Sequence, residues 1–395
     1  MHLFIQLSFL NNLTKFTLHC ILKKKVWSCQ LVMKRATNSA SMRIKNEKMI
    51  LSLINKGPVS RVDIAKKTGL TKAAVTIIVD DLKQRGIVTE QNGKSDTVGR
   101  NPVMLFLNEK AFFAVGVNIT RHHITVGITD LGGNIVVQDD FSICPPDEAL
   151  IRINKTVENQ VEKFGIDISK ILKMSVVSPG PVDTDRGIIL NPPNFKDWNN
   201  VPIVSELKGL TGFDVILENV SSATAIAEKY FGAASETENF LTLRIDEGIG
   251  SGIVINDSLF KGPCELGHTS IKFDGIKCEC GNRGCLEKYA SIPRILDGTP
   301  YKSWRDVVDC GDEKLFDTEA EYLSTAIISA NNIFDFDRVV LCGELTSYES
   351  KRIIELISTK IEKNTLSKKL YKVCAGKVKS KLIIATSMAI HDFFV

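Results

Sequence analysis

No stretch of this sequence reaches the roughly 18 uninterrupted apolar residues that a membrane-spanning helix needs. The most apolar stretch, residues 1–22, is interrupted by Lys15 and lacks the basic start of a signal peptide. A signal or anchor is therefore the lesser alternative, and a translation start at Met33 or Met42 explains this segment more simply. We treat residues 1–42 as a non-native or disordered extension, and we expect a cytoplasmic protein with no membrane partner.

A strong net charge is also missing, because 50 basic and 46 acidic residues leave only +4. A hydrophobic fraction of 44% and a charged fraction of 24% exclude a disordered or collagen-like chain. The charge is nevertheless uneven: residues 1–42 hold 6 basic and no acidic side chains, residues 43–108 hold 12 and 6, and the remainder holds 32 and 40. A basic front on an acidic body indicates that only the front binds a polyanion.

Most of the ten cysteines are scattered through apolar stretches, which is typical of reduced thiols rather than disulfides. Three of them, Cys278, Cys280 and Cys285, are clustered, and His268 precedes them closely. One imidazole and three thiolates complete a tetrahedral zinc shell, and closed shells of this kind are usually structural. The spacing predicts a structural Zn²⁺ site; chance clustering of thiols is the alternative.

The front of the chain has the pattern of a helix-turn-helix. Helical periodicity over residues 46–55 ends at Gly57-Pro58, Ser60 can cap a second helix that ends near residue 69, and Thr71 can cap a third. In this third helix, which ends near residue 85, one stripe must face the core, formed by Val75, Ile78, Val79 and Leu82. Two strands, over residues 87–90 and 103–107, then enclose a basic loop that resembles a wing.

Recognition helices place the N-terminal end of their outward face against base edges in the major groove. Basic residues in a wing neutralise phosphates or enter a minor groove. We therefore predict DNA contacts from Ser60, Thr71, Lys72, Ala73, Thr76, Lys94 and Arg100. The alternative is a three-helix protein-interaction domain with a solvated basic face.

Beyond residue 108 the chain alternates strand-like and polar segments, with strands expected over residues 112–119, 124–130 and 135–139, which predicts an α/β domain. Residues 263–291, with Cys-Glu-Leu-Gly-His, Cys-Glu-Cys-Gly-Asn-Arg-Gly-Cys-Leu-Glu and Tyr-Ala-Ser, resemble the signature of the ROK family of sugar kinases and sugar-responsive repressors. The resemblance covers nearly all of residues 43–395, including the sequence Gly-Arg-Asn-Pro that ends the wing.

This resemblance implies a winged helix-turn-helix over residues 43–108, followed over residues 109–395 by a two-lobed α/β domain of the actin-like, hexokinase-like (ribonuclease H-like) kind. It also implies a homodimer that binds two half-sites of operator DNA. The sugar contacts that it implies are Gly180, Asn194, Asn219, Glu265, His268 and Glu287. Taken singly, the two glutamates are equally compatible with solvated surface carboxylates.

Phosphoryl transfer needs a glycine-rich phosphate cradle and a base beside the acceptor hydroxyl. The family supplies them through Asp-x-Gly-Gly-Thr and through an Asp after Glu-Asn. Here residues 116–122 lack the acid and the paired glycines, and Val220 occupies the base position. The second phosphate loop begins with Asp246 and Glu247, which would repel a triphosphate, and residues 342–344 and 384–388 lack paired glycines.

These departures favour a domain that does not phosphorylate. With them, the resemblance implies a sugar-responsive repressor of carbohydrate utilisation genes, xylose-like or other. Two alternatives stay open: an ATP-dependent sugar kinase that carries a DNA-binding module, and a DNA-binding dimer without a small-molecule ligand.

Overall fold

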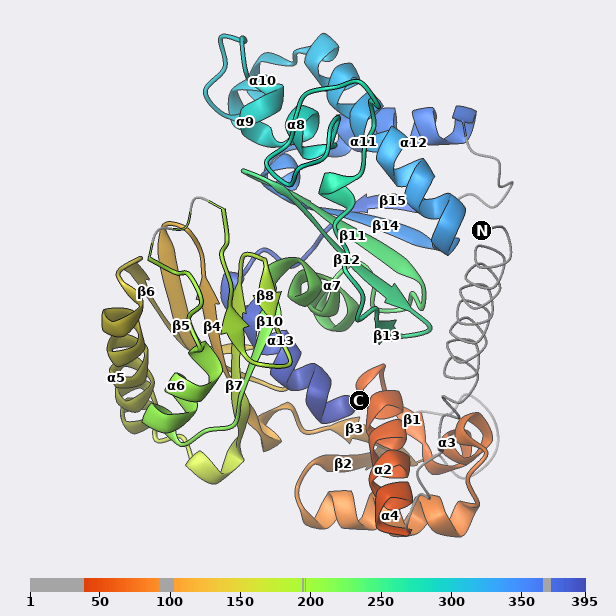
Figure 1. The fold of residues 1–395 in the computed structure, drawn as a ribbon. Coiled ribbons are helices and arrows are strands. Elements are labelled where there is room, and N and C mark those ends of the chain that lie inside the picture. The colour runs from red at the N-terminus through yellow and green to blue at the C-terminus, as the bar shows by residue number, and fades with distance from the viewer. Residues whose placement is uncertain (1–38, 93–102, 194, 196, 365–370) are drawn as a thin grey trace, which may run out of the picture. The chain divides into compact units, whose positions relative to one another are not determined.

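A computed structural model describes residues 39–92, 103–193, 195, 197–364 and 371–395 of the chain (Figure 1). The chain divides into two compact units, Met1–Lys48 and Met49–Val395, and the division falls inside the first described helix. Among the described residues, none of the helices combines the length and apolarity needed to cross a lipid bilayer.

The front of the chain is a winged helix-turn-helix, as the sequence predicts. It contains α2 (Ser39–Asn55), β1 (Val59–Ser60), α3 (Arg61–Thr68), α4 (Lys72–Gln84), β2 (Val88–Asn92) and β3 (Val103–Leu107), with antiparallel strands in the order β1-β3-β2. Within the described residues α2 extends to Ser39, seven residues before the expected residue 46, and residues 39–45 contain no glycine or proline to interrupt it. The four apolar residues of the predicted α4 stripe are all buried.

The helix ends follow from local chemistry. The Ser60 hydroxyl accepts a hydrogen bond from the Asp63 amide at 3.1 Å and caps α3. Gly69 ends that helix in the left-handed region, with φ of 72°. The Thr71 hydroxyl accepts from the Ala74 amide at 3.2 Å and caps α4. The turn between α3 and α4 is therefore encoded by three adjacent signals.

The rest of the chain forms two sheets of the same plan. The first has the order β10-β7-β4-β5-β6 and the second β13-β12-β11-β14-β15. In each, three consecutive strands pair antiparallel, a later strand pairs in parallel with the first of the three, and the last strand pairs in parallel with that added strand. This repeated plan confirms the two-lobed, actin-like α/β fold.

The first lobe contains β4 (Phe113–Ile119), β5 (His123–Asp130), β6 (Ile135–Ser142), α5 (Pro146–Phe164), β7 (Ile171–Ser178), β8 (Val182–Asp183), β9 (Ile188–Ile189), α6 (Ile203–Thr211) and β10 (Val215–Asn219). The buried residues of α5 and α6 pack against one face of its sheet. Helix α13 (Lys381–Phe394) packs against the other face, where Gly116 and Gly127 admit its Leu382 side chain.

The second lobe contains α7 (Val220–Phe231), β11 (Phe240–Ile245), β12 (Ile249–Ile255), β13 (Ser258–Leu259), α8 (Glu287–Ala290), α9 (Ile292–Ile295), α10 (Trp304–Cys310), α11 (Glu313–Phe334), β14 (Arg338–Gly343), α12 (Lys351–Asn364) and β15 (Lys372–Ala375). Its main core joins the sheet to α8 through α12. A second core joins the sheet to α7 and α13. The first turn of α7 follows β10 directly, which places α7 at the junction of the two sheets.

Candidate DNA-binding face, ligand cleft and metal centre

The outward face of α4 is open to solvent. Thr71, Lys72, Ala73 and Thr76 are all exposed, as predicted for a face that meets DNA. The Thr76 hydroxyl donates to the Lys72 carbonyl at 2.9 Å, so its proton is used within the helix. The face also carries Ile77, which is 65% exposed and which the sequence pattern did not single out.

The other predicted DNA contacts are not seen on this exposed face. Ser60 is buried, and its hydroxyl both caps α3 and donates to the Asp63 carboxylate at 2.7 Å. Its side chain is therefore committed inside the domain. Lys94 and Arg100 lie outside the described residues.

An ion-pair network that the sequence did not predict joins α3, α4 and β2. Arg61 contacts Asp80 and Glu90, each at 2.7 Å, and Lys83 also bonds Glu90. Partial burial alone would lower the pKa of Arg61, but its hydrogen bonds to Asp80 and Glu90 outweigh burial and raise it. The hydrogen bond from Lys83, assisted by Arg61, lowers the pKa of Glu90, and Arg61 lowers the pKa of Asp80. Two acids lie near the outward face: Asp80, which this network neutralises, and Asp81, which pairs with Arg85 at 3.2 Å.

Two predicted sugar contacts of the first lobe lie side by side. Asn219 caps α7, with its side-chain oxygen accepting from the Ser221 amide at 2.8 Å. A Cβ atom on Gly180 would lie 2.5 Å from the Asn219 amide nitrogen, so the glycine makes room for that side chain. Val220 is the first residue of α7, next to this pair. Asn194 lies outside the described residues.

The predicted contacts of the second lobe come from the segment between β12 and α8. Glu265 precedes a short 3₁₀ turn, His268 is its last residue, and Glu287 begins α8. The Glu287 carboxylate accepts from the Ile249 amide at 2.8 Å, which fixes it against the start of β12. Desolvation raises the pKa of Glu265; nearby Glu287 adds to this effect, and His268 opposes it. These three side chains therefore interact electrostatically.

The predicted sugar contacts of the first lobe and those of the second lobe both lie near the start of β12. A Cβ atom on Gly250 would collide with the Ser221 hydroxyl of α7, so this glycine allows α7 and β12 to approach closely. Burial raises the pKa of Cys264 to about 11, and the carboxylates of Glu265 and Glu218 both contribute. Burial also raises the pKa of Glu218. Two further polar groups, Glu218 and Cys264, therefore lie near the predicted sugar contacts, and neither was predicted as a contact.

The segments that correspond to the two phosphate loops contact one another. Arg121 contacts Glu247 at 3.4 Å and His122 contacts it at 3.0 Å. Asp246 pairs with Arg244 at 2.6 Å. Because both carboxylates have cationic partners, the charge repulsion predicted at this loop is weaker than the sequence suggested. Beside it, Glu247 and Glu344 contribute to the lining of an open cavity of about 380 Å³.

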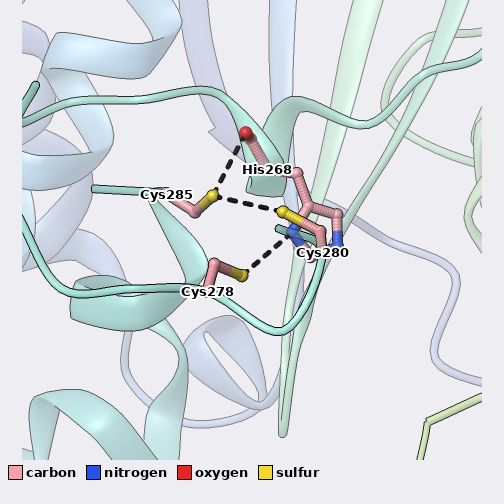
Figure 2. A group of neighbouring side chains, drawn as sticks. All are labelled: His268, Cys278, Cys280 and Cys285. Carbon is pink, nitrogen blue, oxygen red and sulfur yellow. Dashed lines mark hydrogen bonds between the residues drawn. The ribbon is translucent and has the colours of Figure 1, made fainter. Parts of the chain in front are cut away.

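The four predicted metal ligands form one cluster (Figure 2). Their ligand atoms all lie within 4.8 Å of one another, with Cys278 Sγ 3.6 Å from His268 Nδ1 and Cys280 Sγ 3.6 Å from Cys285 Sγ. A tetrahedral ion with Zn–S bonds of about 2.3 Å requires edges of about 3.8 Å between sulfurs. The two shorter separations are close to this value, so the cluster could hold a metal of this size.

The loop around this cluster is held by its own contacts. Lys288 donates to the Glu279 carboxylate at 2.8 Å, which lowers the pKa of Glu279 to about 2. A Cβ atom on Gly284, whose φ is +68°, would lie 1.6 Å from the Lys272 carbonyl oxygen, so only glycine fits there. Backbone hydrogen bonding at Asn282 lowers the pKa of Cys280, whereas burial raises the pKa values of Cys278 and Cys285 in the metal-free cluster.

Comparison with known families identifies two segments of the chain. The ROK family profile matches residues 114–382, and a profile described as MarR family matches residues 45–100. The chain is 30% identical over 313 residues to the xylose repressor of Bacillus subtilis, covering 75% of this chain and 81% of the relative. It is 28% identical over 369 residues to the DNA-binding transcriptional dual regulator NagC of Escherichia coli, covering 85% and 89%.

Solved structures agree with these matches. The crystal structure of a ROK family transcriptional regulator, described as a homolog of the E. coli MLC protein, superimposes with a TM-score of 0.76 at 25% identity, covering 89% of this chain and 97% of the other. The ROK hexokinase of Thermus thermophilus superimposes with a TM-score of 0.63 at 24% identity over 71% of this chain and 99% of the other. The hexokinase shares the fold of the part that follows the winged helix-turn-helix.

Proposed function

Because the chain belongs to the ROK family, we propose that it is a sugar-responsive repressor whose winged helix-turn-helix binds operator DNA and whose kinase-like domain senses sugar without phosphorylating it. The broader class is established: the chain is a DNA-binding transcriptional regulator, with separate matches to a MarR-type segment and to the ROK domain. Carbohydrate utilisation genes are the targets suggested by the names of its relatives, xylose repressor and N-acetylglucosamine repressor.

The observation that carries this proposal is the free outward face of α4. Thr71, Lys72, Ala73 and Thr76 are exposed there, while the opposite stripe is buried in the domain core. The N-terminal end of such a helix meets base edges when the helix enters a major groove. We include Lys94 and Arg100 of the wing among the phosphate contacts, on the strength of the charge pattern alone.

Selection of bound fragments from the source genome by the purified protein tests this proposal directly. We expect enrichment of a palindromic site and its release by one member of a sugar panel that includes xylose, glucose and N-acetylglucosamine. Enrichment that no sugar reverses would favour the ligand-free DNA-binding dimer. Failure to enrich any site would contradict the repressor function.

We infer that the kinase-like domain transfers no phosphate. Val220, at the start of α7, follows the predicted sugar contact Asn219 directly, and its isopropyl group cannot accept a proton. The segments corresponding to the phosphate loops are joined by the contacts of Arg121 and His122 with Glu247. A coupled assay with ATP, Mg²⁺ and the sugar panel should detect no turnover; turnover abolished by Glu265→Ala would establish the kinase alternative.

We assign sugar binding to Gly180, Asn194, Asn219, Glu265, His268 and Glu287. The adjacency of Gly180 and Asn219 and the electrostatic grouping of the last three support this set. Carboxylates, amides and an imidazole together satisfy several hydroxyl groups in fixed directions. A sugar that raises the melting temperature of the wild type, but not of Glu265→Ala, would support this assignment, and no shift with any sugar would contradict it.

We further infer that His268, Cys278, Cys280 and Cys285 hold a structural Zn²⁺. When bound, the ion cross-links the 3₁₀ turn to the cysteine loop and leaves no coordination position open for catalysis. Because Nδ1 of His268 faces the Cys278 sulfur, its Nε2 stays available to a sugar hydroxyl. The metal site would thus orient one of the sugar-binding side chains.

We also propose a homodimer, since palindromic half-sites require two recognition helices. Analytical ultracentrifugation of the free protein should give twice the chain mass of 43.7 kDa. A monomer, both free and bound to the selected site, would contradict this part of the proposal.

A further inference from the structure

Helix α4 carries an isoleucine that the domain does not use for folding. Ile77 is 65% exposed, whereas its neighbours Val75, Ile78 and Val79 are buried. With about 100° between successive residues, Ile77 lies about 200° around the helix from Val75. Ala73 lies about 160° from Val75 in the same count. Both therefore project opposite the core, in the centre of the face that is open to solvent.

The polar side chains nearest Ile77 are engaged within the domain. Asp81, one turn after Ile77, pairs with Arg85 at 3.2 Å. The Thr76 hydroxyl donates to the Lys72 carbonyl, and Ala73 contributes only a methyl group. Asp80, which lies on this side of the helix one turn after Thr76, is held and neutralised by Arg61 at 2.7 Å. The centre of the outward face is thus an apolar surface formed by Ala73, Thr76 and Ile77, with Lys72 at its N-terminal end.

An apolar surface on a recognition helix has one specific counterpart in DNA. On the major-groove edges of the four bases, hydrogen-bonding groups predominate, and the 5-methyl group of thymine is the apolar feature. We propose that Ile77 contacts a thymine methyl group in each half-site and selects thymine at that position. This assignment rests on the proposed DNA binding by α4 and adds a specificity-determining residue to it.

The test uses full-length protein and duplexes enriched from a random DNA pool by the wild type. Each duplex is resynthesised with deoxyuridine in place of one thymine per half-site, which removes only the methyl group. Burial of one methyl group contributes about 0.8 kcal/mol, equivalent to about a fourfold change in Kd. We expect the wild type to lose about fourfold in affinity per half-site at one position, and Ile77→Ala to bind both duplexes equally there.

A matched control is available in Ile151→Ala, since Ile151 is 64% exposed on α5 of the first lobe. This variant should discriminate thymine from uracil as the wild type does. Two results would overturn the role of Ile77 and leave DNA binding intact. In one, the wild type enriches a site but binds the thymine and uracil duplexes equally. In the other, Ile77→Ala still discriminates between them. Failure of the wild type to enrich any site would overturn DNA binding itself and this assignment with it.

Discussion

Glu319 is a carboxyl group in the middle of an apolar core. It lies on α11 with no exposed surface, and the described residues offer neither of its oxygens a hydrogen-bond partner. Desolvation raises its pKa well above the ordinary 4.5, so the folded protein retains a proton that the unfolded chain releases. Stability therefore falls as the pH rises above about 4.5, until the pH reaches the raised pKa.

Replacing this side chain should stabilise the protein. Glu319→Leu removes an unsatisfied polar group, and we expect a gain of about 1 to 3 kcal/mol at pH 7.5. Glu319→Gln removes the proton while keeping a polar group, so it should abolish the pH dependence with a smaller gain. Urea denaturation between pH 5 and pH 8 measures both effects. A loss of stability in Glu319→Leu, with the pH dependence unchanged, would contradict this account.

At the metal cluster the critical residue is Cys280, whose side chain is exposed and whose sulfur is 3.6 Å from that of Cys285. Cys280→Ser removes one thiolate from the predicted shell, so metal content should fall from about one zinc per chain and the melting temperature should drop. Elemental analysis measures the first and a thermal scan the second. Cys310→Ser alters another exposed free cysteine and should change neither. A well-folded wild type without metal would refute the zinc assignment.

The sequence predicted some of these residues and not others for a physical reason. His268 and the three cysteines lie within 18 positions of one another, so their spacing alone predicts that they bind one metal ion. The Arg61 network joins residues separated by 19 and 29 positions, and its formation depends on how α3, α4 and β2 pack. Glu319 likewise looks like an ordinary helix-surface glutamate until the fold places it in the core.

At the scale of elements, the contact between β4 and α13 depends on a glycine. A Cβ atom on Gly116 would lie 2.7 Å from Thr386 Cγ2 and 2.9 Å from Leu382 Cδ1. Gly116→Ala should therefore destabilise the protein by about 1 to 3 kcal/mol, as overpacking does. Thr386→Ser removes the closest methyl group and should recover part of that loss in the double variant.

Gly209→Ala is the matched control for this comparison. Gly209 lies inside α6, and a Cβ atom there would meet no heavy atom within 4 Å. Alanine should stabilise that helix by about 0.5 to 1 kcal/mol. Denaturation curves that show equal effects for the two glycines would contradict the close packing of α13 on β4.

The cap of α3 gives a prediction that separates folding from DNA contact at Ser60. Because its buried hydroxyl bonds Asp63, Ser60→Ala should cost about 1 kcal/mol of stability and leave Kd for the selected duplex unchanged. Ser60→Thr keeps the capping hydroxyl and should retain most of the stability. A large loss of DNA affinity in Ser60→Ala, without loss of stability, would instead assign the residue to DNA.

The predictability of the elements varies with how local their signals are. The caps at Ser60 and Thr71 and the buried stripe of α4 follow from adjacent residues, and the structure agrees with them. Helix α2 extends further towards the N-terminus than the periodicity over residues 46–55 predicts, because apolar periodicity marks where a helix packs rather than its full length. The parallel pairing of β7 with β4, and of β10 with β7, joins segments far apart in the sequence, which residue patterns do not encode locally.

For the whole molecule, the separation of charge predicts how DNA binding responds to salt. Residues 43–108 hold 12 basic and 6 acidic side chains, and the acidic remainder of the chain is expected to stay away from the phosphates. Each phosphate contact contributes about 0.9 to the slope of log K against log salt concentration. Removing a wing cation should reduce the magnitude of that slope without changing base preference.

The size of the reduction measures how many chains bind one site. If two chains occupy two half-sites, Lys94→Ala or Arg100→Ala removes two contacts at once, and the slope should fall by about 1.8. A single bound chain would give about 0.9. Lys155→Ala, at an exposed position on α5, serves as the control and should leave the slope unchanged. A fall in slope of about 1.8 requires both the wing contact and the second chain. If neither wing variant changes the slope, the wing contacts are refuted. If the slope falls by only about 0.9, the dimer is refuted and the wing contact stands.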